Sequence, residues 1–443
     1  MSFPPGAVFR RQLTKDLETA AEASGVWITT AGGRRLLDGS GGPLVVNVGH
    51  GRPEIARAVE VQVRTCAYVH PTMFTGEAVE TLAARLAALA PPGIERFYFM
   101  TTGSEAVETA LKLARQIHLE RGDAQRYRVI SRWKSYHGLS MGALAATGRT
   151  GFRTPFAPML PESHHIPAPY CYRCSYGLTH PACGLRCAAA LEEAIVELGP
   201  ATVAAFIAET VSGATIAAVV PPEGYFGRIR EICDRHGVLL ILDEVLCGLG
   251  RTGRWFAAEH ADVVPDLVTM GKGLAGGSVA LSAVGVQARW FEAICKGSGA
   301  FVHGGTFSHH QVACAAGNAV LDILEQEDLV ARVARVGPRL GEMLSNRLGN
   351  HPHVGDIRGI GFLWGVEFVA DRDSRQPFPR KEHVAERIWE RLYADGVLLY
   401  KATGLAGLDG DAMIVGPPFI ASSADLEQIV AALGTAVEAV LGG

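Results

Sequence analysis

The strongest constraint on the fold is an apolar run that ends in two acids. Residues 238–242 are all Val, Leu or Ile, and Asp243 and Glu244 follow directly. An uninterrupted run of this kind predicts a strand buried on both faces, as in a parallel sheet covered by helices. Ligands of open α/β sheets bind at the carboxyl ends of such strands. Asp243 is therefore either a structural acid or a carboxylate that meets a ligand.

A lysine interrupts a second apolar, glycine-rich segment. Lys272 is one of only seven lysines in the chain and stands between Gly271 and Gly273. A lysine placed there is expected to be partly buried, and burial lowers the pKa of the amine. A neutral amine is a nucleophile that can form a Schiff base with an aldehyde or ketone. The alternative is a lysine whose charged end reaches solvent from a strand end.

A turn of small residues supplies a candidate anion site. Residues 96–115 predict a strand, the turn Thr102-Gly103-Ser104 and a helix. Backbone N–H groups and a hydroxyl at a helix N-terminus bind anions, although most such turns are ordinary caps. A buried carboxylate such as Asp243 can keep a pyridine nitrogen protonated. Lysine, acid and turn together match one cofactor, pyridoxal phosphate.

A fourth segment, a predicted strand followed by a loop, also bears on this cofactor. Residues 127–133 predict a strand, and Tyr136-His137-Gly138 follow. Tyr136 can lie flat on a planar ring, and Gly138 lets the backbone come close. The alternative is an aromatic side chain buried in the core.

These motifs resemble the class III aminotransferases (subgroup II, ω-type) among the fold type I pyridoxal-phosphate enzymes. The matching segments run nearly end to end: 25–27, 47–53, 102–106, 135–138, 243–245, 250–253, 272–273, 305–308 and 416–419. The resemblance implies an α/β fold, with a mostly parallel, doubly wound sheet in a large domain and a small α+β domain built from both termini. We expect the small domain from residues 1–60 and 326–443, and the large cofactor-binding domain from 61–325.

The resemblance also implies roles around the cofactor ring. Lys272 would form the Schiff base and shuttle a proton, and Asp243 would pair with the pyridinium nitrogen. Tyr136 would stack on one face of the ring, and Val245 would pack under the other. His137 matches the motif in a supporting role.

Further roles concern the phosphate and the subunit interface. By the same resemblance, Gly103 and Ser104 would hold the phosphate, and Thr306 would reach it from the neighbouring subunit. A homodimer with a shared active site is therefore expected. Glu209 matches a strand-end acid near the cofactor that often pairs with a gating arginine, and Arg251 lies in a turn that we interpret as structural.

Composition sets limits on the class of protein. The chain has 443 residues, of which 48% are hydrophobic and 19% charged, and its net charge is −4. The length and the hydrophobic content are enough for a large core. The slightly negative net charge does not favour binding to nucleic acid. We find no signal peptide and no membrane-spanning run, and expect a cytoplasmic protein. Strands are expected near 26–29, 35–38 and 361–368, helices near 328–349 and 382–395, and loops near 150–190 and 401–411.

Four of the nine cysteines fall within 17 residues: Cys171, Cys174, Cys183 and Cys187. Paired cysteines in the cytosol usually bind zinc rather than form disulfides, but only eight residues separate the two pairs, which is tight for a tetrahedral site. A structural metal, free or reversibly oxidised thiols and two disulfides stay open, and we assign no metal to the catalytic site. The cluster is similar to an insertion, here about 165–190, of some class III members, including taurine–pyruvate-like ones.

The predicted function is a pyridoxal-phosphate-dependent aminotransferase. It would move an amino group from a primary amine or ω-amino acid to a 2-oxo acid, with pyruvate favoured, by a ping-pong Schiff-base mechanism. A racemase, decarboxylase or phospho-lyase of the same fold is the alternative, because these enzymes use the same lysine and acid. A second alternative is a non-catalytic scaffold that binds the cofactor.

The expected substrate follows from one position at which this chain differs from related aminotransferases. Ornithine-type members carry an arginine three residues before the Pro-Pro pair, which binds the α-carboxylate and swings against the strand-end glutamate; here that position is Ile414. Glu209 is thus expected to lose its partner, and Lys401, the only cation in 400–411, lacks the planar fork of an arginine. We expect a donor whose amine is not α to a carboxylate. The alternative is that Arg153 or Arg173 folds over the site.

Overall fold

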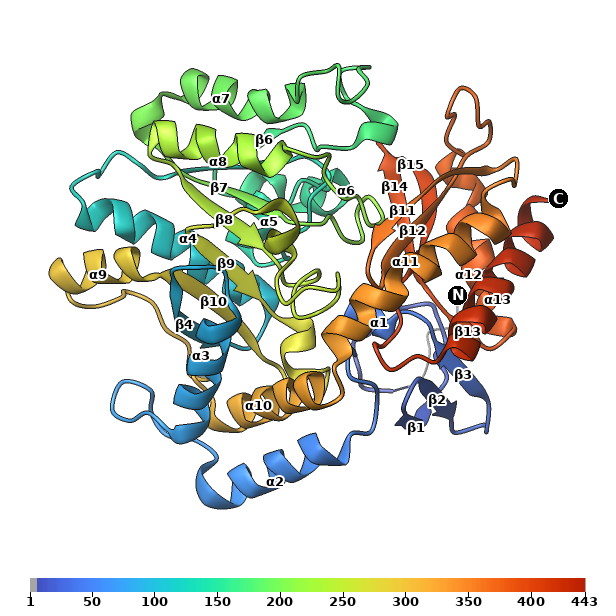
Figure 1. Ribbon diagram of the computed structural model, residues 1–443, viewed down its shortest axis with the longest axis horizontal. Helices are drawn as coiled ribbons and strands as arrows, with labels where there is room; N and C mark the ends of the chain where they lie inside the picture. Colours follow the sequence, from blue (N-terminus) through green and yellow to red (C-terminus); the bar gives the residue numbers. More distant parts are fainter. Residues whose placement is uncertain (1–5, 443) are drawn as a thin grey trace.

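The computed structural model describes residues 6–442, which build three sheets with helices around them (Figure 1). The central sheet of these residues has seven strands, in the order β4 (Ile94–Met100), β10 (Ser282–Gln287), β9 (Leu267–Met270), β8 (Leu239–Asp243), β7 (Val203–Glu209), β5 (Arg128–Arg132) and β6 (His164–Ile166). Neighbouring strands are parallel except where β10 pairs with β4 and β9. The predicted doubly wound, mostly parallel sheet is confirmed.

Helices cover both faces of the central sheet. One face carries α4 (Gly103–Glu120), α5 (Met141–Ala146) and α9 (Ala288–Lys296), and the other carries α7 (Arg186–Leu198) and α8 (Tyr225–His236). Successive strand residues point to opposite faces, so Ile207 and Ile241 enter the first core while Phe206 and Leu240 enter the second. This explains why β7 and β8 are apolar throughout. Beyond β4, α2 (Pro53–Cys66), α3 (Glu77–Leu89) and α10 (Gln311–Gln326) pack together.

The ends of the chain lie together on the other side of the molecule (Figure 1). One sheet joins β1 (Ala20–Ser24), β2 (Trp27–Thr30) and β3 (Arg35–Asp38) to β13 (Val397–Leu398). Another has the order β11 (Val354–Ile360), β12 (Leu363–Phe368), β15 (Asp409–Val415) and β14 (Tyr400–Ala406). Three helices cover them: α11 (Leu329–Leu348), α12 (Val384–Ala394) and α13 (Ser423–Leu441). The strands and helices expected in these regions are therefore confirmed.

The domain limits stay a prediction, and two elements bear on them. The limit at residue 60 falls inside α2, whereas the limit at 325 falls at the end of α10, just before α11 begins. None of the helices within residues 6–442 has the length and apolar character that crossing a membrane requires.

The loop expected at 401–411 is wrong, because this stretch is a β-hairpin. β14 and β15 pair antiparallel, with Lys401 opposite Met413 and Thr403 opposite Asp411, and the pairing shifts between Thr403 and Ala406. Gly407, which has a φ of 84°, stands in the turn. The glycines that suggested a loop instead provide the left-handed backbone of the turn and of the irregularity beside it.

Parallel pairing brings the carboxyl ends of three central strands level. Glu209 at the end of β7 lies opposite Asp243 at the end of β8, and Asp243 lies opposite Thr269 in β9. Lys272 follows directly, as the first residue of a short 3-10 turn over Lys272–Ala275. The two acids and the lysine therefore meet at one edge of the sheet.

Candidate active site

A cavity of about 330 Å³ lies at the carboxyl edge of the central sheet. Its wall includes eight of the nine predicted site residues: Gly103, Ser104, Tyr136, His137, Glu209, Asp243, Val245 and Lys272. The ninth, Thr306, is exposed and does not line this cavity. The structure thus brings together residues from five separate segments of the chain.

Lys272 is held in a strained backbone conformation. Its φ is 44°, in the left-handed region that non-glycine residues rarely adopt. Burial lowers the pKa of its amine, although the nearby carboxylates of Asp243 and Glu209 act in the opposite direction. The turn therefore aims a partly desolvated amine into the cavity.

Asp243 is a buried carboxylate with three donors around it. Its Oδ1 accepts hydrogen bonds from Val245 N (3.1 Å) and Thr269 Oγ1 (3.0 Å), and its Oδ2 lies 2.7 Å from His137 Nδ1. His137 is itself fixed by a hydrogen bond from its backbone N–H to Thr147 Oγ1 (2.9 Å). His137 thus orients the acid from behind, which fits a supporting role.

The neighbouring acid, Glu244, faces away from the cavity. It accepts hydrogen bonds from Ala257 N (2.6 Å), Ala258 N (2.7 Å) and Thr210 Oγ1 (3.0 Å). Burial raises the pKa of this carboxyl to about 7. Of the two acids that end the apolar run, only Asp243 can meet a ligand.

The N-terminus of α4 offers open donors on the cavity wall. Thr102 and Glu105 cap each other, since Glu105 N donates to Thr102 Oγ1 (3.3 Å) and Thr102 N donates to Glu105 Oε2 (2.8 Å). The capping bonds do not use the N–H groups of Gly103 and Ser104, which stay open to an anion. A Cβ at Gly103 would lie 2.9 Å from Val245 Cγ1, so only glycine leaves this approach open.

Glu209 has an arginine partner, contrary to the expectation that it would be left alone. The buried guanidinium of Arg132, at the end of β5, lies 3.9 Å from Glu209 Oε2 and donates to Glu209 O (2.6 Å). Burial raises the pKa of Glu209, and Arg132 acts against that shift. We expected the partner near the C-terminus, but a neighbouring strand of the same sheet supplies it.

The arginines proposed to fold over the site do not reach it. Arg153 Nη1 donates to the carbonyl oxygens of Leu144 and Thr147, both at 3.1 Å. Arg173 Nε lies 2.5 Å from Glu367 Oε1 in β12. Both guanidinium groups therefore serve the structure, and neither lines the cavity.

Two other arginines line the cavity, and neither was among the residues expected from the sequence. These are Arg149, in the loop before the short helix α6 (Thr150–Arg153), and Arg11. Their guanidinium carbons lie 4.6 Å and 5.9 Å from the centre of the Phe152 ring. Ile414, the residue at the expected arginine position, is buried in β15 among apolar side chains. No local pattern distinguishes Arg149 from other loop arginines.

The segment with four cysteines connects the two parts of the molecule. Tyr170 and Arg173 both contact the buried carboxylate of Glu367, which also lies 2.8 Å from Arg358 Nη1. Cys171, Cys174, Cys183 and Cys187 are free thiols. Within residues 6–442, no group of three or more His, Cys, Asp or Glu side chains is arranged to hold a metal ion.

The fold and this cavity define a fold type I pyridoxal-phosphate enzyme. The sequence profile described as Aminotransferase class-III matches residues 10–437, and the chain belongs to this family of pyridoxal-phosphate-dependent enzymes. The diaminobutyrate–2-oxoglutarate transaminase of Halomonas elongata is 36% identical over 423 residues, which cover 94% of this chain and 89% of that protein.

Solved structures give the same assignment. The (S)-enantioselective ω-transaminase from Thermomicrobium roseum superposes with a TM-score of 0.90 at 38% identity, covering 96% of this chain and 93% of that one. An amine transaminase from an uncultivated Pseudomonas species, in its pyridoxal-phosphate-bound form, gives a TM-score of 0.89 at 34% identity over 99% and 98% of the two chains. The predicted family, fold and cofactor are confirmed.

The cavity fits this cofactor on structural grounds. The open helix N-terminus suits a phosphate, and the absence of a Cβ at Gly103 gives it room. A Cβ at Gly138 would lie 2.3 Å from Ser104 Oγ, so glycine is required there too. Asp243 and Lys272 present the acid and the amine that a pyridine ring and an aldehyde require.

Proposed function

We propose that the protein transfers an amino group from a primary amine or ω-amino acid to a 2-oxo acid, with pyruvate favoured, in two ping-pong half reactions. The observation that carries this proposal is the pairing of Glu209 with Asp243 at the strand ends, with Lys272 on the wall of the same cavity. An apolar residue, Ile414, stands at the position where ornithine-type members hold an α-carboxylate. The ω-transaminase named in the comparisons supports the same donor class.

Each residue around the ring has a distinct task in this proposal. Bound pyridoxal phosphate supplies a reactive aldehyde carbon and a ring that accepts electrons. Asp243, oriented by His137, keeps a proton on the ring nitrogen. Tyr136 would cover one face of the ring and Val245 the other, which would limit the access of water.

Lys272 is the proposed catalytic base. Its amine would hold the cofactor through the aldehyde carbon in the resting enzyme and would become free when a donor amine takes its place. Nζ would then take the proton from the donor's Cα and deliver it to the carbon that had borne the cofactor's aldehyde, and in the second half reaction it would move a proton the opposite way, onto Cα of the acceptor. The lowered pKa of Lys272 suits this task, because a neutral amine can accept a proton.

The phosphate site is proposed to be shared between two subunits. Gly103 and Ser104 would hold the phosphate from one chain, and Thr306 would reach it from the partner copy. Thr306 is exposed in a segment whose next residue, Phe307, makes edge contact with Tyr68 (6.2 Å between ring centres). Met73 and Phe74 are 72% and 61% exposed, and neighbouring exposed apolar side chains are typical of protein–protein contacts, which supports the proposed dimer. We also propose that the protein is located in the cytoplasm.

A substrate panel tests the proposed function. The holoenzyme is mixed with β-alanine, taurine, propylamine, glutamate or ornithine, and conversion of the cofactor is followed by absorbance before pyruvate or 2-oxoglutarate is added. We expect ω-amines to convert the cofactor fastest and pyruvate to restore it best. Glutamate, or ornithine reacting at its α-amine, exceeding every ω-amine in kcat/KM would contradict the inference from Ile414.

A further inference from the structure

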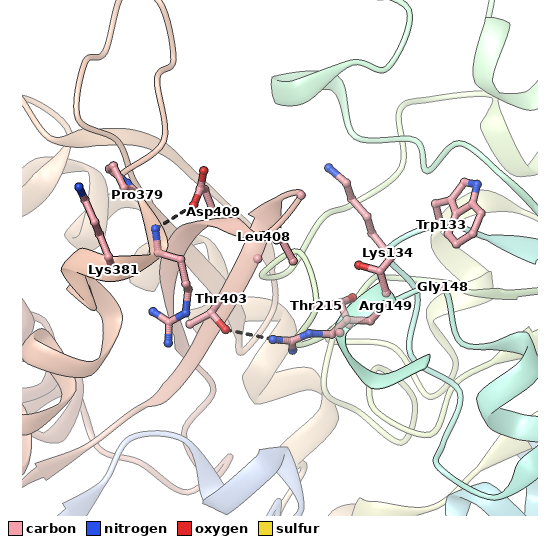
Figure 2. A pocket seen from close by; sticks show the side chains of 15 residues that line it. Trp133, Lys134, Gly148, Arg149, Thr215, Pro379, Lys381, Thr403, Leu408 and Asp409 are labelled. Atoms are coloured by element: carbon pink, nitrogen blue, oxygen red, sulfur yellow. Dashed lines mark hydrogen bonds between the residues drawn. The ribbon is translucent and has the colours of Figure 1, made fainter. Parts of the chain in front are cut away.

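A second cavity adjoins the cofactor cavity, and the two meet at Arg149. The second cavity has a volume of about 720 Å³ and lies between the loop after β5 and the β14–β15 hairpin (Figure 2). Arg149 and Thr215 line both cavities. A molecule that extends from Lys272 toward the second cavity must therefore pass the Arg149 guanidinium.

Arg149 crosses the gap between the two parts of the molecule. Figure 2 shows its side chain reaching from the large sheet's side toward β14, where Nη2 donates to Thr403 Oγ1 (3.0 Å). A guanidinium has five N–H donors. Among residues 6–442, Thr403 is the one hydrogen-bond partner of this guanidinium, and the ionisable groups that act on it are Tyr400, Arg380 and Arg11, none of which is a carboxylate. Most of its donors are thus free.

The other arginines around the two cavities are already engaged. Arg132 bonds to Glu209, Arg153 to backbone carbonyls, and Arg380 lies 2.9 Å from Glu386 Oε2 through Nη1. Arg11 lines the cavity mouth, but its side chain is exposed, and exposed charges are screened by salt. Arg149 is therefore the arginine on the cavity wall with both free donors and a sheltered position.

The surroundings of Arg149 strengthen its attraction for an anion. The guanidinium lies over Phe152, and burial lowers its pKa, while Tyr400 acts against that shift. An arginine keeps its proton under such conditions, and its charge acts more strongly where water is partly excluded. The second cavity adds Lys134 and Lys381, against the single acid Asp409. An anionic group is therefore favoured at this junction.

We propose that Arg149 is the residue that binds the carboxylate or sulfonate of the substrates. This inference rests on the proposed function and deepens it. Donor and acceptor occupy the cavity in turn, so one guanidinium can serve the remote anionic group of an ω-amino acid and then the carboxylate of pyruvate. Its planar fork matches a carboxylate by two parallel hydrogen bonds, which the missing arginine at Ile414 would otherwise supply.

Matched substrate pairs test the proposal. β-Alanine is compared with propylamine as donor, and pyruvate with propanal as acceptor, because propylamine and propanal carry the reacting amine or carbonyl group but no carboxylate. In Arg149→Gln, we expect kcat/KM to fall about 10- to 100-fold for β-alanine and pyruvate, and less than about twofold for propylamine and propanal. Arg149→Lys, which keeps the charge but loses the fork, should fall between. Equal losses on charged and uncharged substrates would overturn the proposal.

Two controls separate binding from structure. Binding of unreactive propionate to the holoenzyme, measured by isothermal titration calorimetry, should weaken at least tenfold in Arg149→Gln and stay unchanged in Arg372→Gln, an exposed arginine elsewhere. Thr403→Val removes the bridge to β14 but leaves the guanidinium. If it weakens propionate binding as much as Arg149→Gln does, Arg149 acts only as a structural bridge and the inference is wrong.

The outcome for the proposed function is read separately. A wild-type enzyme that converts no amine at all refutes aminotransfer, and the propionate titration still tests Arg149. A wild-type enzyme that is active, with an Arg149→Gln variant that keeps the wild-type ratio between β-alanine and propylamine, refutes only this inference. Melting temperatures of all variants confirm that the fold is intact.

Discussion

Replacing Asp243 with asparagine tests the centre of the proposed mechanism. The amide keeps an oxygen that can accept from Val245 N and Thr269 Oγ1, now at 3.1 Å and 3.0 Å. In place of the second carboxylate oxygen, asparagine has an NH₂ group that faces His137 Nδ1. In the wild type, this ring nitrogen lies 2.7 Å from the carboxylate oxygen. The change thus removes one buried negative charge and one acceptor with little change of shape.

The size of the effect follows from the burial of this charge. Removing one partner of a buried ion pair costs about 3–5 kcal/mol, and each 1.4 kcal/mol or so changes a rate about tenfold. We therefore expect kcat/KM to fall by about 10²- to 10⁴-fold, because the ring nitrogen is no longer held protonated. The cofactor should remain bound through the α4 N-terminus and Lys272.

Stopped-flow absorbance of the amine half reaction measures this loss directly, and cofactor content and melting temperature are measured on the same samples. Glu244→Gln is the matched control, because Glu244 is the adjacent buried acid and faces away from the cavity. Its rate should stay within a few-fold of wild type. An Asp243→Asn variant that retains near wild-type rates with full cofactor occupancy would show that Asp243 is structural.

The remaining predictions concern other parts of the chain. Borohydride reduction should fix the cofactor on Lys272 alone, as judged by peptide mass spectrometry, and labelling of another lysine would end the assignment. The folded-state pKa of Glu244, about 7, lies above its ordinary value of 4.5, so the folded protein binds more protons between these values and its stability falls as pH rises through that window. In urea titrations from pH 5 to 8, Glu244→Gln should remove up to about 3 kcal/mol of this fall, and an unchanged pH slope would contradict it. Thr306→Ala should raise the dissociation constant of the cofactor, and active monomers would refute the shared site. The double substitution Cys171→Ser and Cys174→Ser should lower the melting temperature more than it lowers the catalytic rate. Metal analysis of untagged protein tests whether the four cysteines bind zinc.

The central sheet could be predicted because its signals are local. A strand buried on both faces must be apolar throughout, and its end is marked where polar residues begin, as at Asp243. Parallel strands of one sheet then bring their carboxyl ends to one edge, which placed Lys272 near Asp243 without further information. The 400–415 hairpin was missed because Gly404, Gly407 and Gly410 suggest a loop as readily as a bulged turn.

The cavity's charged wall could not be predicted in the same way. Glu209 meets Arg132 because β5 and β7 are neighbours in space, and Arg149 meets Thr403 because a loop crosses toward a distant hairpin. Both contacts depend on packing between segments far apart in sequence. Arg153 and Arg173 looked equally suitable in the sequence. In the structure, however, Arg153 donates to backbone carbonyl oxygens and Arg173 pairs with Glu367.

The contacts of Tyr170 and Arg173 with Glu367 have a consequence for how this enzyme accepts different substrates. They fasten the 165–190 segment to β12 through a carboxylate with no solvent exposure, backed by Arg358. Breaking such a buried cluster is costly, so we expect the two parts of the molecule to keep one separation through the catalytic cycle. Changes of substrate range should then come from side chains on the cavity wall rather than from a wider opening.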